Sequence, residues 1–449
     1  MNHPPKRKVL YIVHNHPAVR PGGAETYALE LYEAMKTSGS YEPIFLAKGG
    51  PPISNTRKPH EGTILGSVNS DPNQYFFYTE GFDYDWLHGT ARVKDLYVKF
   101  FREFLTAYRP DVVHFQHTLH LGYDMIREVR TTLPQAPILY TLHEYLPICH
   151  RNGQMLRTND EDRCLEESPR RCHECFPDIS PQAFFMRKRF IQSHFSLVDR
   201  FLAPSHFLLE RYLDWGVPKE KIEFEDYGRP AAHVSIAPET DRPRNRIAFF
   251  GQLTFFKGAL VLLKAMQLLE HEESKSARQS ALRFGSAPAA RSEGIHLWMH
   301  GANLEIQAGS FQTEFRAMID ATKRNVTFVG RYEPEEIGRL MANVDWVVIP
   351  SIWWENAPLV IQEAFIHKRP VICSDIGGMA EKVTDGVNGL HFRAGDPLSL
   401  AETIRKAATT PGLWDQLRQG IPEIYRIEDS VAKLTGIYDT LLAKTPSLS

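Results

Sequence analysis

Residues 346–364 read WVVIPSIWWENAPLVIQEA and decide the fold. The first four residues form a short apolar run rich in valine, which predicts a buried strand, and a helix is expected to begin at Ala357 or Pro358. Two glutamates flank the helix start, with seven residues between them. Glu355 lies in the loop before the helix, and Glu363 lies more than one turn inside it. The stretch is therefore a strand, a loop and a helix in direct succession.

The same order of strand and helix repeats on both sides of this stretch. In the second half, apolar runs predict strands at 247–250, 295–300, 326–329, 371–374 and 390–392, with helices beginning at Gly258, Gln312, Pro334 and Pro397. In the first half, strands are expected at 9–14, 111–116, 137–142 and 200–203, with helices at 24–36, 122–132 and 205–215. Strands that alternate with helices form parallel sheets with right-handed crossovers. The sequence therefore predicts an α/β fold class with doubly wound parallel sheets.

Length and composition divide the chain into two domains. A chain of 449 residues exceeds the roughly 250–300 residues at which a single hydrophobic core stops growing. Residues 229–244 are rich in Pro, Asp and Arg and lack an apolar period, so we expect a linker there. The expected domains are residues 1–228 and 245–410, followed by helices in 411–449 that pack back toward the first domain. Residues 49–73 and 271–294 are expected to be surface excursions.

The charge balance limits the partners. The formal net charge is −2 and the pI is about 6.8, which argues against nucleic acid as a partner. Because no run reaches the ~18 apolar residues of a membrane span, we expect a cytoplasmic protein with at most peripheral membrane contact. Residues 91–108 mix Lys and Arg with Leu, Tyr and Phe, and a crossover helix with one buried face is favoured over a helix on the inner membrane surface. The oligomeric state stays open.

The loop and first helical turn after residue 354 suit a diphosphate. Amide groups at a helix start lack partners within the helix, and the helix dipole favours negative charge there. Glu355 is then suited to accept hydrogen bonds from sugar hydroxyls, and Glu363 from a ribose diol. On spacing alone, a surface glutamate and a helix glutamate on an ordinary strand and helix explain the pair equally well. The segment that presents the amides comprises Asn356, Ala357, Pro358 and Leu359.

The residues around this pair resemble the C-terminal signature of the family 4 retaining glycosyltransferases. The resemblance rests on Pro350-Ser351, Glu355, Glu363-Ala364, Pro370-Val371, Gly377-Gly378, Glu381, Gly386, Gly389-Leu390 and Gly395-Asp396. Upstream, Phe250-Gly251-Gln252-Leu253 and Lys257-Gly258 are similar to the family's glycine turn and its diphosphate-binding lysine, and Val329-Gly330-Arg331 resembles the strand end that touches the base. The N-terminal matches are Pro21-Gly22-Gly23-Ala24-Glu25 and Thr141-Leu142-His143-Glu144, so the resemblance covers nearly the whole chain.

The resemblance implies a GT-B architecture, with two Rossmann-like domains facing across a cleft, and a retaining transfer from a nucleoside-diphosphate sugar. It implies that Glu355 meets the donor sugar, Glu363 the ribose and Lys257 the diphosphate, with His143 near the reacting centre. It implies no protein nucleophile, and attack on the same face, assisted by the leaving diphosphate, is the preferred mechanism. Many members have arginine where this chain has Gln252, so positive charge at the phosphates is reduced or comes from elsewhere, with Arg331 and Arg229 as candidates.

Several of these candidates also have structural explanations. A lysine before a helix start is often simply solvated, but the position of Lys257 after a strand at the entrance of the second sheet favours a ligand role. Gly22 and Gly23 either let the backbone approach a ligand closely or form a tight turn. His143 either supports the structure or hydrogen-bonds the donor sugar or phosphate at its strand end. At least one of three further histidines is expected to face the acceptor: His114, His117 and His120.

Four of the five cysteines lie in one insertion of about residues 149–178, which many members of the resembled family lack. Their spacing, C-x14-C-x7-C-x2-C, favours a structural zinc ion over free or disulfide-linked thiols, with an iron–sulfur cluster as a less favoured alternative. Asp83-Tyr84-Asp85 has the form of a metal-binding motif of glycosyltransferases with another fold, but acidic turn residues explain it better, so no catalytic metal is expected. The proposed zinc ligands are Cys149, Cys164, Cys172 and Cys175.

The combined expectation is a retaining glycosyltransferase that moves a sugar to an acceptor hydroxyl, with cell-surface polysaccharide or glycoconjugate synthesis as the first choice of pathway. The acceptor is a saccharide, a lipid-linked intermediate or a small molecule. Two alternatives stay open. A sugar-nucleotide epimerase of the same architecture needs acid–base pairs on both sides of the sugar, and a non-catalytic nucleotide-sugar-binding protein needs no acceptor at all. The sequence specifies neither the donor sugar nor the base.

Overall fold

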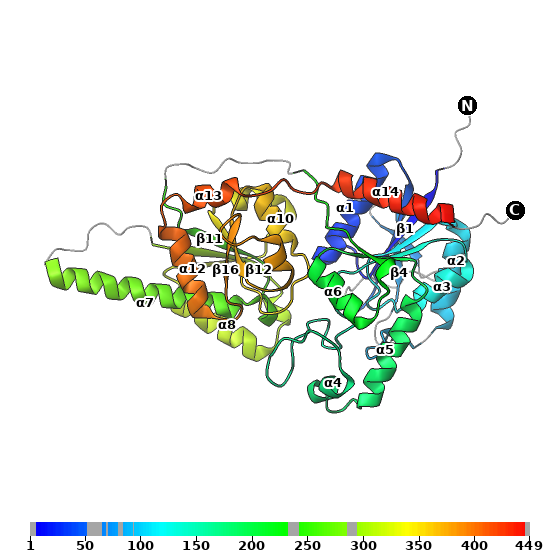
Figure 1. The fold of residues 1–449 in the computed structure, drawn as a ribbon, viewed down its shortest axis with the longest axis horizontal. Coiled ribbons are helices and arrows are strands. Elements are labelled where there is room, and N and C mark those ends of the chain that lie inside the picture. Colours follow the sequence, from blue (N-terminus) through cyan, green and yellow to red (C-terminus); the bar gives the residue numbers. More distant parts are fainter. Residues whose placement is uncertain are drawn as a thin grey trace. The chain divides into compact units, whose positions relative to one another are not determined.

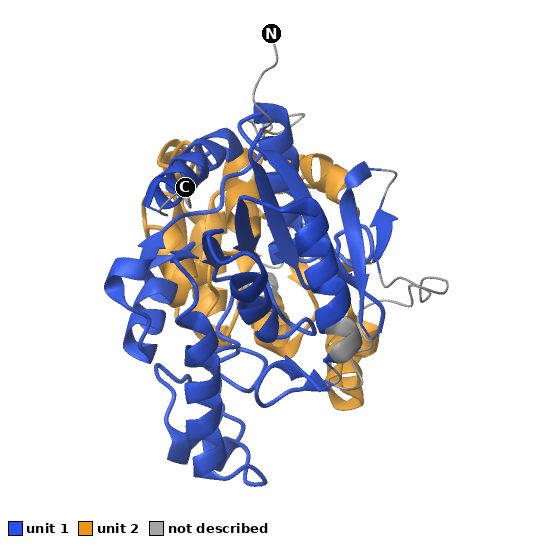
Figure 2. Ribbon diagram, turned by 90° about the vertical axis from the view of Figure 1, so that its right-hand side faces the viewer, with its two compact units in different colours: residues 1–230, 425–449 blue, residues 231–424 orange. Residues whose placement is uncertain are grey.

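The chain divides into two compact units, which Figure 2 colours separately. One unit comprises residues 1–230 and 425–449, and the other comprises residues 231–424. The structure is a computed structural model and describes residues 6–51, 65–68, 71–79, 84–92, 94–231, 242–284 and 294–444. The second unit is thus one continuous segment, whereas the first unit is completed by the last helix of the chain.

The first unit is built on an eight-stranded sheet of order β10-β9-β8-β7-β1-β2-β4-β3. Neighbouring strands are parallel, except for β3 and β4, which are antiparallel. Residues 9–13 in β1 are fully buried, as expected for a parallel strand that helices cover on both faces. The strands are β1 (Lys8–Val13), β2 (Glu42–Gly49), β3 (Leu65–Val68), β4 (Asp71–Tyr78), β7 (Val112–Phe115), β8 (Ile138–Thr141), β9 (Arg200–Ala203) and β10 (Ile222–Phe224), with a separate hairpin of β5 (Tyr84–Asp85) and β6 (Thr90–Ala91).

The last helix, α14 (Ile427–Lys444), packs against α1 (Gly23–Ser38), as Figure 1 shows. Its buried residues Ile427, Val431, Leu434 and Tyr438 recur at the spacing of one helix face. The Tyr438 hydroxyl also lies 2.8 Å from Nδ1 of the buried His114 on β7. The last helix therefore completes the core of the first unit. The other helices of this unit are α2 (Asp95–Tyr108), α3 (Asp124–Thr132), α4 (Pro169–Cys175), α5 (Pro181–Phe195), α6 (His206–Trp215) and the short η2 (Lys219–Lys221).

The second unit is built on a six-stranded parallel sheet of order β13-β12-β11-β14-β15-β16. Numbered from its own first strand, this is the order 3-2-1-4-5-6 of a dinucleotide-binding fold, whose switch point lies between β11 and β14. Ligands of such sheets bind beyond the carboxyl ends of the strands at that point. The strands are β11 (Arg246–Gln252), β12 (His296–Ala302), β13 (Val326–Gly330), β14 (Trp346–Ile349), β15 (Val371–Ser374) and β16 (Gly389–Phe392).

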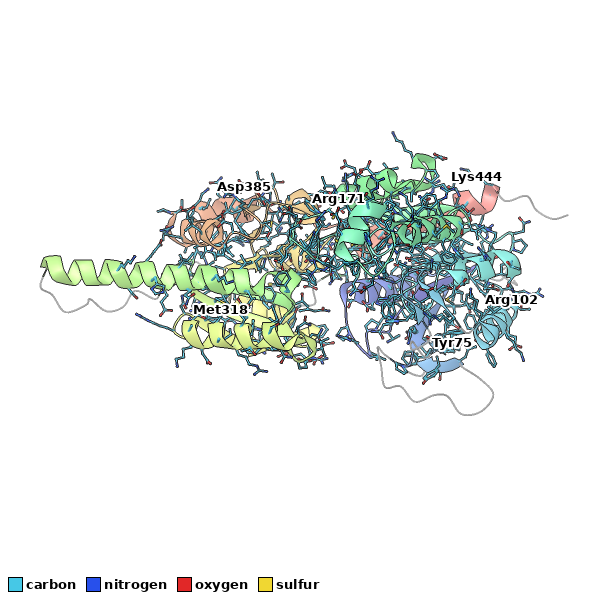
Figure 3. All side chains as sticks on the ribbon, turned by 90° about the horizontal axis from the view of Figure 1, so that it is seen from below. Tyr75, Arg102, Arg171, Met318, Asp385 and Lys444 are labelled. Atoms are coloured by element: carbon cyan, nitrogen blue, oxygen red, sulfur yellow. The ribbon has the colours of Figure 1, made fainter. Side chains whose placement is uncertain are left out.

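Two apolar clusters form the core of the second unit. One joins α7, α8, α12 and α13 to the sheet through side chains such as Leu263 and Trp414, and Met318 of α8, labelled in Figure 3, packs against it. The other joins α9, α10 and α11 through Ile361 and Met379. The helices are α7 (Ala259–Phe284), α8 (Gly309–Thr322), α9 (Ile337–Ala342), α10 (Leu359–Ile366), α11 (Gly377–Lys382), α12 (Pro397–Thr409) and α13 (Leu413–Gln419), with short turns η3 (Phe255–Lys257), η4 (Leu304–Ile306) and η5 (Pro334–Glu336).

The predicted fold class, α/β with two doubly wound parallel sheets, is confirmed by these two units. Several predicted strands match to the residue, among them 200–203, 346–349 and 371–374. The favoured crossover helix within 91–108 is present as α2, whose Phe101, Phe104 and Leu105 are buried.

Other local expectations differ from the structure. The expected loop at 49–73 contains β3 and the start of β4, although residues 52–64 and 69–70 lie outside the described part of the chain. The expected excursion at 271–294 begins as helix, because α7 continues to Phe284 through residues that favour helix. The tail expected from residue 411 is divided: α13 belongs to the second unit, and the chain returns to the first unit only at Tyr425. Residues 232–241 of the expected linker lie outside the described residues.

Candidate active site

Glu355 is a buried carboxylate with three hydrogen-bond donors on one oxygen. Nζ of Lys257 lies 2.6 Å from its Oε1, the Ser351 hydroxyl donates to the same atom at 2.7 Å, and the Trp353 indole N–H donates at 3.1 Å. The Glu355 side chain is only 7% exposed, and a buried charge of this kind persists only when it is paired and hydrogen-bonded. The Lys257 ammonium also lies 5.7 Å from the centre of the Trp353 ring. Lysine, glutamate and indole thus form one connected group.

Two glycines permit this arrangement. Gly258 follows Lys257 with a φ of 71°, and a Cβ there would lie 1.8 Å from the carbonyl oxygen of Pro350. Gly378 donates its N–H to the Glu355 carbonyl at 2.8 Å, and a Cβ there would lie 1.4 Å from the carbonyl oxygen of Asn356. The end of β11 and the loop after β14 therefore approach each other more closely than any larger residue would allow.

The helix that follows Glu355 is α10, which begins at Leu359 with Pro358 as its N-cap. No side chain caps its first turn, so the first amide groups have no partner inside the helix and are available to an anion. Asn356 and Ala357 are buried in the loop before it. Glu363 lies in the second turn and is half-buried, and its charge contributes, after burial, to the raised pKa of Tyr332. The predicted donor-binding stretch thus has the predicted geometry.

An aromatic group lies at the carboxyl ends of β11, β12 and β13. The rings of Phe250 and His300 stack at 4.7 Å between centres, and Tyr332 meets Phe250 edge-on at 5.6 Å. Burial lowers the pKa of His300, whose Nδ1 has no hydrogen-bond partner among the described residues. Sequence reasoning missed His300 and Tyr332, because neither belongs to the quoted motifs. The register of β11 with β12, which pairs residue 250 with residue 300, is what joins the two rings.

The candidates for phosphate charge and for the base have different surroundings. Gly330 ends β13 with a φ of 90°, and Gly251 on β11 is half-buried. Arg331 is exposed and lies 3.4 Å from Glu333. Gln252 is exposed. Arg229 belongs to the first unit, where its guanidinium forms a 2.5 Å ion pair with Glu30, so its charge is already compensated locally.

His143 lies in the first unit, directly after β8, with both ring nitrogens in hydrogen bonds. Its Nδ1 lies 2.6 Å from the Tyr227 hydroxyl, and its Nε2 lies 2.9 Å from Oε1 of Gln116. Burial lowers the pKa of His143 to about 3, so the ring is neutral at physiological pH. Gly22 is the N-cap of α1 and Gly23 its first residue; a Cβ on Gly22 would meet Oε2 of Glu25 at 2.5 Å. The predicted glycine turn therefore lies against a buried carboxylate.

The four clustered cysteines are all free and half-buried. Cys172 and Cys175 lie one turn apart on α4, and Cys164 donates its N–H to the Met155 carbonyl at 2.7 Å. Within the described residues, no group of three or more His, Cys, Asp or Glu side chains is placed to hold a metal ion. The zinc site therefore stays a prediction.

Two further expectations concern metal and membrane. Asp83 lies outside the described residues, and Asp85 is used within a turn, where it accepts the N–H groups of Leu87 and His88 and lies 2.9 Å from the His88 ring. A search of the described helices finds none with the length and apolar character needed to span a bilayer.

Two protein-family models match the chain. Residues 21–224 match the model described as Glycosyltransferase Family 4, and residues 244–410 match the model described as Glycosyl transferases group 1. Among curated relatives, the D-inositol 3-phosphate glycosyltransferase of Corynebacterium efficiens is 28% identical over 190 residues, which are 39% of this chain and 40% of that protein. An uncharacterised glycosyltransferase of Methanocaldococcus jannaschii is 24% identical over 234 residues, 50% of this chain and 49% of that protein. The chain thus aligns with less than half the length of these relatives.

Solved structures share the whole fold. Sucrose-phosphate synthase from Thermosynechococcus elongatus superimposes with a TM-score of 0.67 at 17% identity, covering 98% of this chain and 100% of that one. Anabaena HepE, in a complex with UDP and glucose, superimposes with a TM-score of 0.63 at 14% identity, covering 97% and 100%. These likenesses confirm the predicted GT-B fold. With one family model on each unit and the GT-B fold throughout, the chain is a family 4 glycosyltransferase.

Proposed function

We propose that this protein transfers a sugar from a nucleoside-diphosphate sugar to an acceptor hydroxyl, with retention of the anomeric configuration. The observation that carries the proposal is the carboxylate of Glu355, buried beside the Lys257 ammonium and just before the uncapped start of α10. A buried carboxylate, a cation and free amides on one strand–helix junction match the parts of a sugar diphosphate, which has hydroxyls next to negative charge.

Each part of the site has a role in this reaction. The Lys257 ammonium and the first amides of α10 bind the diphosphate and offset the negative charge that grows on it as it departs. Glu355 accepts hydrogen bonds from donor-sugar hydroxyls, and Glu363 accepts them from the ribose diol. The bond between the anomeric carbon and the diphosphate oxygen breaks while the acceptor oxygen bonds to the same face. A leaving phosphate oxygen takes the acceptor proton, so no protein nucleophile is needed.

The relatives suggest the first ligands to try. The structure of Anabaena HepE holds UDP and glucose, so UDP-glucose is the first donor to test. The Corynebacterium relative is named for an inositol phosphate acceptor, so small polyols join saccharides and lipid-linked sugars as acceptor candidates. We place the reaction on the cytoplasmic side, in polysaccharide or glycoconjugate synthesis, where nucleotide sugars are made.

The test is a thermal-shift screen against UDP, GDP, ADP and dTDP and their sugar conjugates, because a ligand that binds only the folded state raises the unfolding temperature. We expect one nucleotide class to stabilise the wild type, Glu363→Ala to lose that response, and Glu402→Ala, an exposed glutamate of α12, to keep it. No response from any nucleotide would refute the donor site. Donor turnover only with an acceptor supports a transferase, conversion of the donor sugar alone supports an epimerase, and binding without turnover supports a non-catalytic protein.

We also propose that the insertion at about 149–178 binds a structural zinc ion. Its support is the clustering of four thiols that influence one another: burial raises the pKa of Cys149 to about 11, and nearby Cys164 adds to the rise. Burial likewise raises the pKa of Cys172 to about 12, to which Cys149 contributes. A cation beside such thiols would favour their thiolate form.

Elemental analysis of the purified protein tests this proposal. We expect about one zinc per chain in the wild type and in the Cys373→Ser control, and little in Cys172→Ser/Cys175→Ser. A visible absorption band with bound iron would support an iron–sulfur cluster instead. Four thiols that alkylate freely in a metal-free protein would refute both.

A further inference from the structure

The first unit contains buried polar atoms that lack partners at the ends of two neighbouring strands. Nδ1 of His14, Oδ1 of Asn15 and Nε2 of Gln116 are buried and have no hydrogen-bond partner among the described residues. His14 and Asn15 directly follow β1, and Gln116 directly follows β7, which pairs with β1. The backbone N–H of Gln116 donates to the Ile12 carbonyl at 2.8 Å, so the two strand ends lie side by side.

A buried polar atom without a partner costs roughly 1–3 kcal/mol, so three together at one sheet edge need an explanation. Asn15 and Gln116 are almost completely buried, at 1% and 0% exposure. The carboxyl ends of parallel strands in such sheets are also where ligands bind. A ligand that supplies the missing partners is therefore the simplest explanation.

The orientation of Gln116 is fixed by His143. The Gln116 side-chain oxygen can only accept, so Nε2–H of His143 must donate to it, and Nδ1 of His143 then accepts from the Tyr227 hydroxyl. The low pKa of His143 agrees with a neutral ring that has one donor and one acceptor nitrogen. With its oxygen bound in this way, Gln116 keeps its amide N–H groups for another partner.

The other two side chains are held in a comparable way. Nε2 of His14 lies 3.1 Å from Oε1 of Glu25, whose pKa is lowered by His14 although burial alone would raise it. Asn15 donates its amide to the Arg20 carbonyl at 2.8 Å, which leaves its oxygen as an acceptor. Each side chain thus has one end fixed by the protein and the other end without a protein partner.

The chemistry of these atoms indicates the class of ligand. They comprise a neutral amide donor, a neutral amide acceptor and an imidazole nitrogen. A hydroxyl group donates and accepts at the same time, so a ring with several neighbouring hydroxyls would satisfy all three atoms.

We propose that His14, Asn15 and Gln116 form a sugar-binding subsite in the first unit, and that His143 is a positioning residue that orients Gln116. The proposal rests on the proposed function, since the sugar is that of the donor or of the acceptor. It changes the role expected for His143, which acts through Gln116 rather than by touching the sugar.

The experiment compares wild type with Gln116→Met, which keeps length and volume but removes the amide. Calorimetry measures binding of UDP, GDP, ADP and dTDP, and of UDP-glucose, GDP-mannose, ADP-glucose and dTDP-glucose. NMR then measures binding of methyl α-glucoside, methyl α-mannoside and methyl α-galactoside to the nucleotide-bound protein. Gln182→Met, an exposed glutamine of α5, is the matched control.

We expect Gln116→Met to weaken one class of sugar at least fivefold while binding of the nucleotide alone changes less than twofold. Weaker nucleotide-sugar binding assigns the subsite to the donor sugar, and weaker glycoside binding assigns it to the acceptor. Unchanged binding of both, or a wild type that binds no sugar beyond its nucleotide, overturns the proposal. Loss of nucleotide binding in Glu363→Ala is independent of these results and tests the donor site itself.

The positioning role has its own variants. His143→Gln keeps an N–H donor near the position of Nε2 and should retain sugar binding within twofold of wild type, whereas His143→Leu should lose as much as Gln116→Met. The double variant Gln116→Met/His143→Leu should lose no more than either single variant, because both remove the same contact. Additive losses, or a His143→Gln protein as weak as His143→Leu, would show that His143 does not act through Gln116.

Discussion

The ammonium nitrogen of Lys257 lies 2.6 Å from Oε1 of Glu355, although 98 residues separate them along the chain. The strand pairing of β11 with β14 brings their segments together, and Gly258 allows the last approach. One side chain binds negative charge and the other accepts hydroxyl protons, so in the absence of a ligand each compensates the other.

Replacement of Lys257 should therefore affect both stability and activity. In Lys257→Met the Glu355 carboxylate stays buried with only its neutral donors, and we expect a loss of about 1–3 kcal/mol in the free energy of unfolding. Lys257→Met/Glu355→Gln should recover part of that loss, because the unpaired charge is gone, while transfer activity stays absent. Urea denaturation and a transfer assay separate the two effects. A double variant less stable than the sum of both single variants would contradict the pairing.

The loop that carries Glu355 should not tolerate a side chain at Gly378. In Gly378→Ala the new methyl group would lie 1.4 Å from the Asn356 carbonyl oxygen, so the loop must move. We expect a loss of roughly 2–4 kcal/mol and weaker nucleotide-sugar binding. Gly309→Ala, at a glycine with open space around it, is the control and should change stability by less than about 1 kcal/mol. Wild-type melting of Gly378→Ala would show that the loop adapts without cost.

Glu144 should make stability depend on pH. Burial raises the pKa of Glu144 to about 8 from an ordinary value near 4.5, although the Leu146 N–H and Arg187 lower it, and His117 lies 3.4 Å away. Between these values the folded protein keeps a proton that the unfolded chain has lost, so stability falls as the pH rises from about 4.5 to 8.

The variant Glu144→Gln should remove this contribution, whose slope is at most roughly 1.4 kcal/mol per pH unit. Melting curves at several pH values measure the difference between wild type and variant, and Glu166→Gln, an exposed neighbour in the chain, serves as control. A difference that does not grow between pH 5 and pH 8 would mean that Glu144 titrates normally.

A stabilising change is expected at Gly436. This residue is exposed within α14, and a Cβ there would meet nothing within 4 Å. Gly436→Ala lowers the backbone entropy of the unfolded chain at a position where helix is already formed, so we expect a gain of about 0.5–1 kcal/mol. A higher melting temperature at unchanged activity checks this, and a lower one would mean that α14 is strained at that position.

The sequence predicts the elements whose signals are local. Residues 346–349 are a run of large apolar residues, all buried in the structure, and the strand was placed to the residue. β4 was missed because it begins with Asp71, Pro72 and Asn73, which read as a turn, and only Tyr75 to Tyr78 have strand character. A sheet neighbour, β2, stabilises it, and that neighbour is not adjacent in sequence.

The candidate site divides in the same way. Glu355, Glu363 and Lys257 were found because their spacing and neighbours form motifs. The partners that give them their properties come from elsewhere: Trp353 and Ser351 share one glutamate oxygen with Lys257, and Gln116 holds His143 from a different strand. Such pairings depend on sheet register and loop geometry, which a single sequence does not contain.

The return of α14 to the first unit has a consequence for synthesis on the ribosome. The first 230 residues emerge early, yet Tyr11 and His114 obtain their Tyr438 partner only when the last helix is made. The second unit is uninterrupted and is able to reach its native state while the earlier one still waits, open on its α1 side. The order of folding along this chain is therefore expected to run opposite to the order of translation.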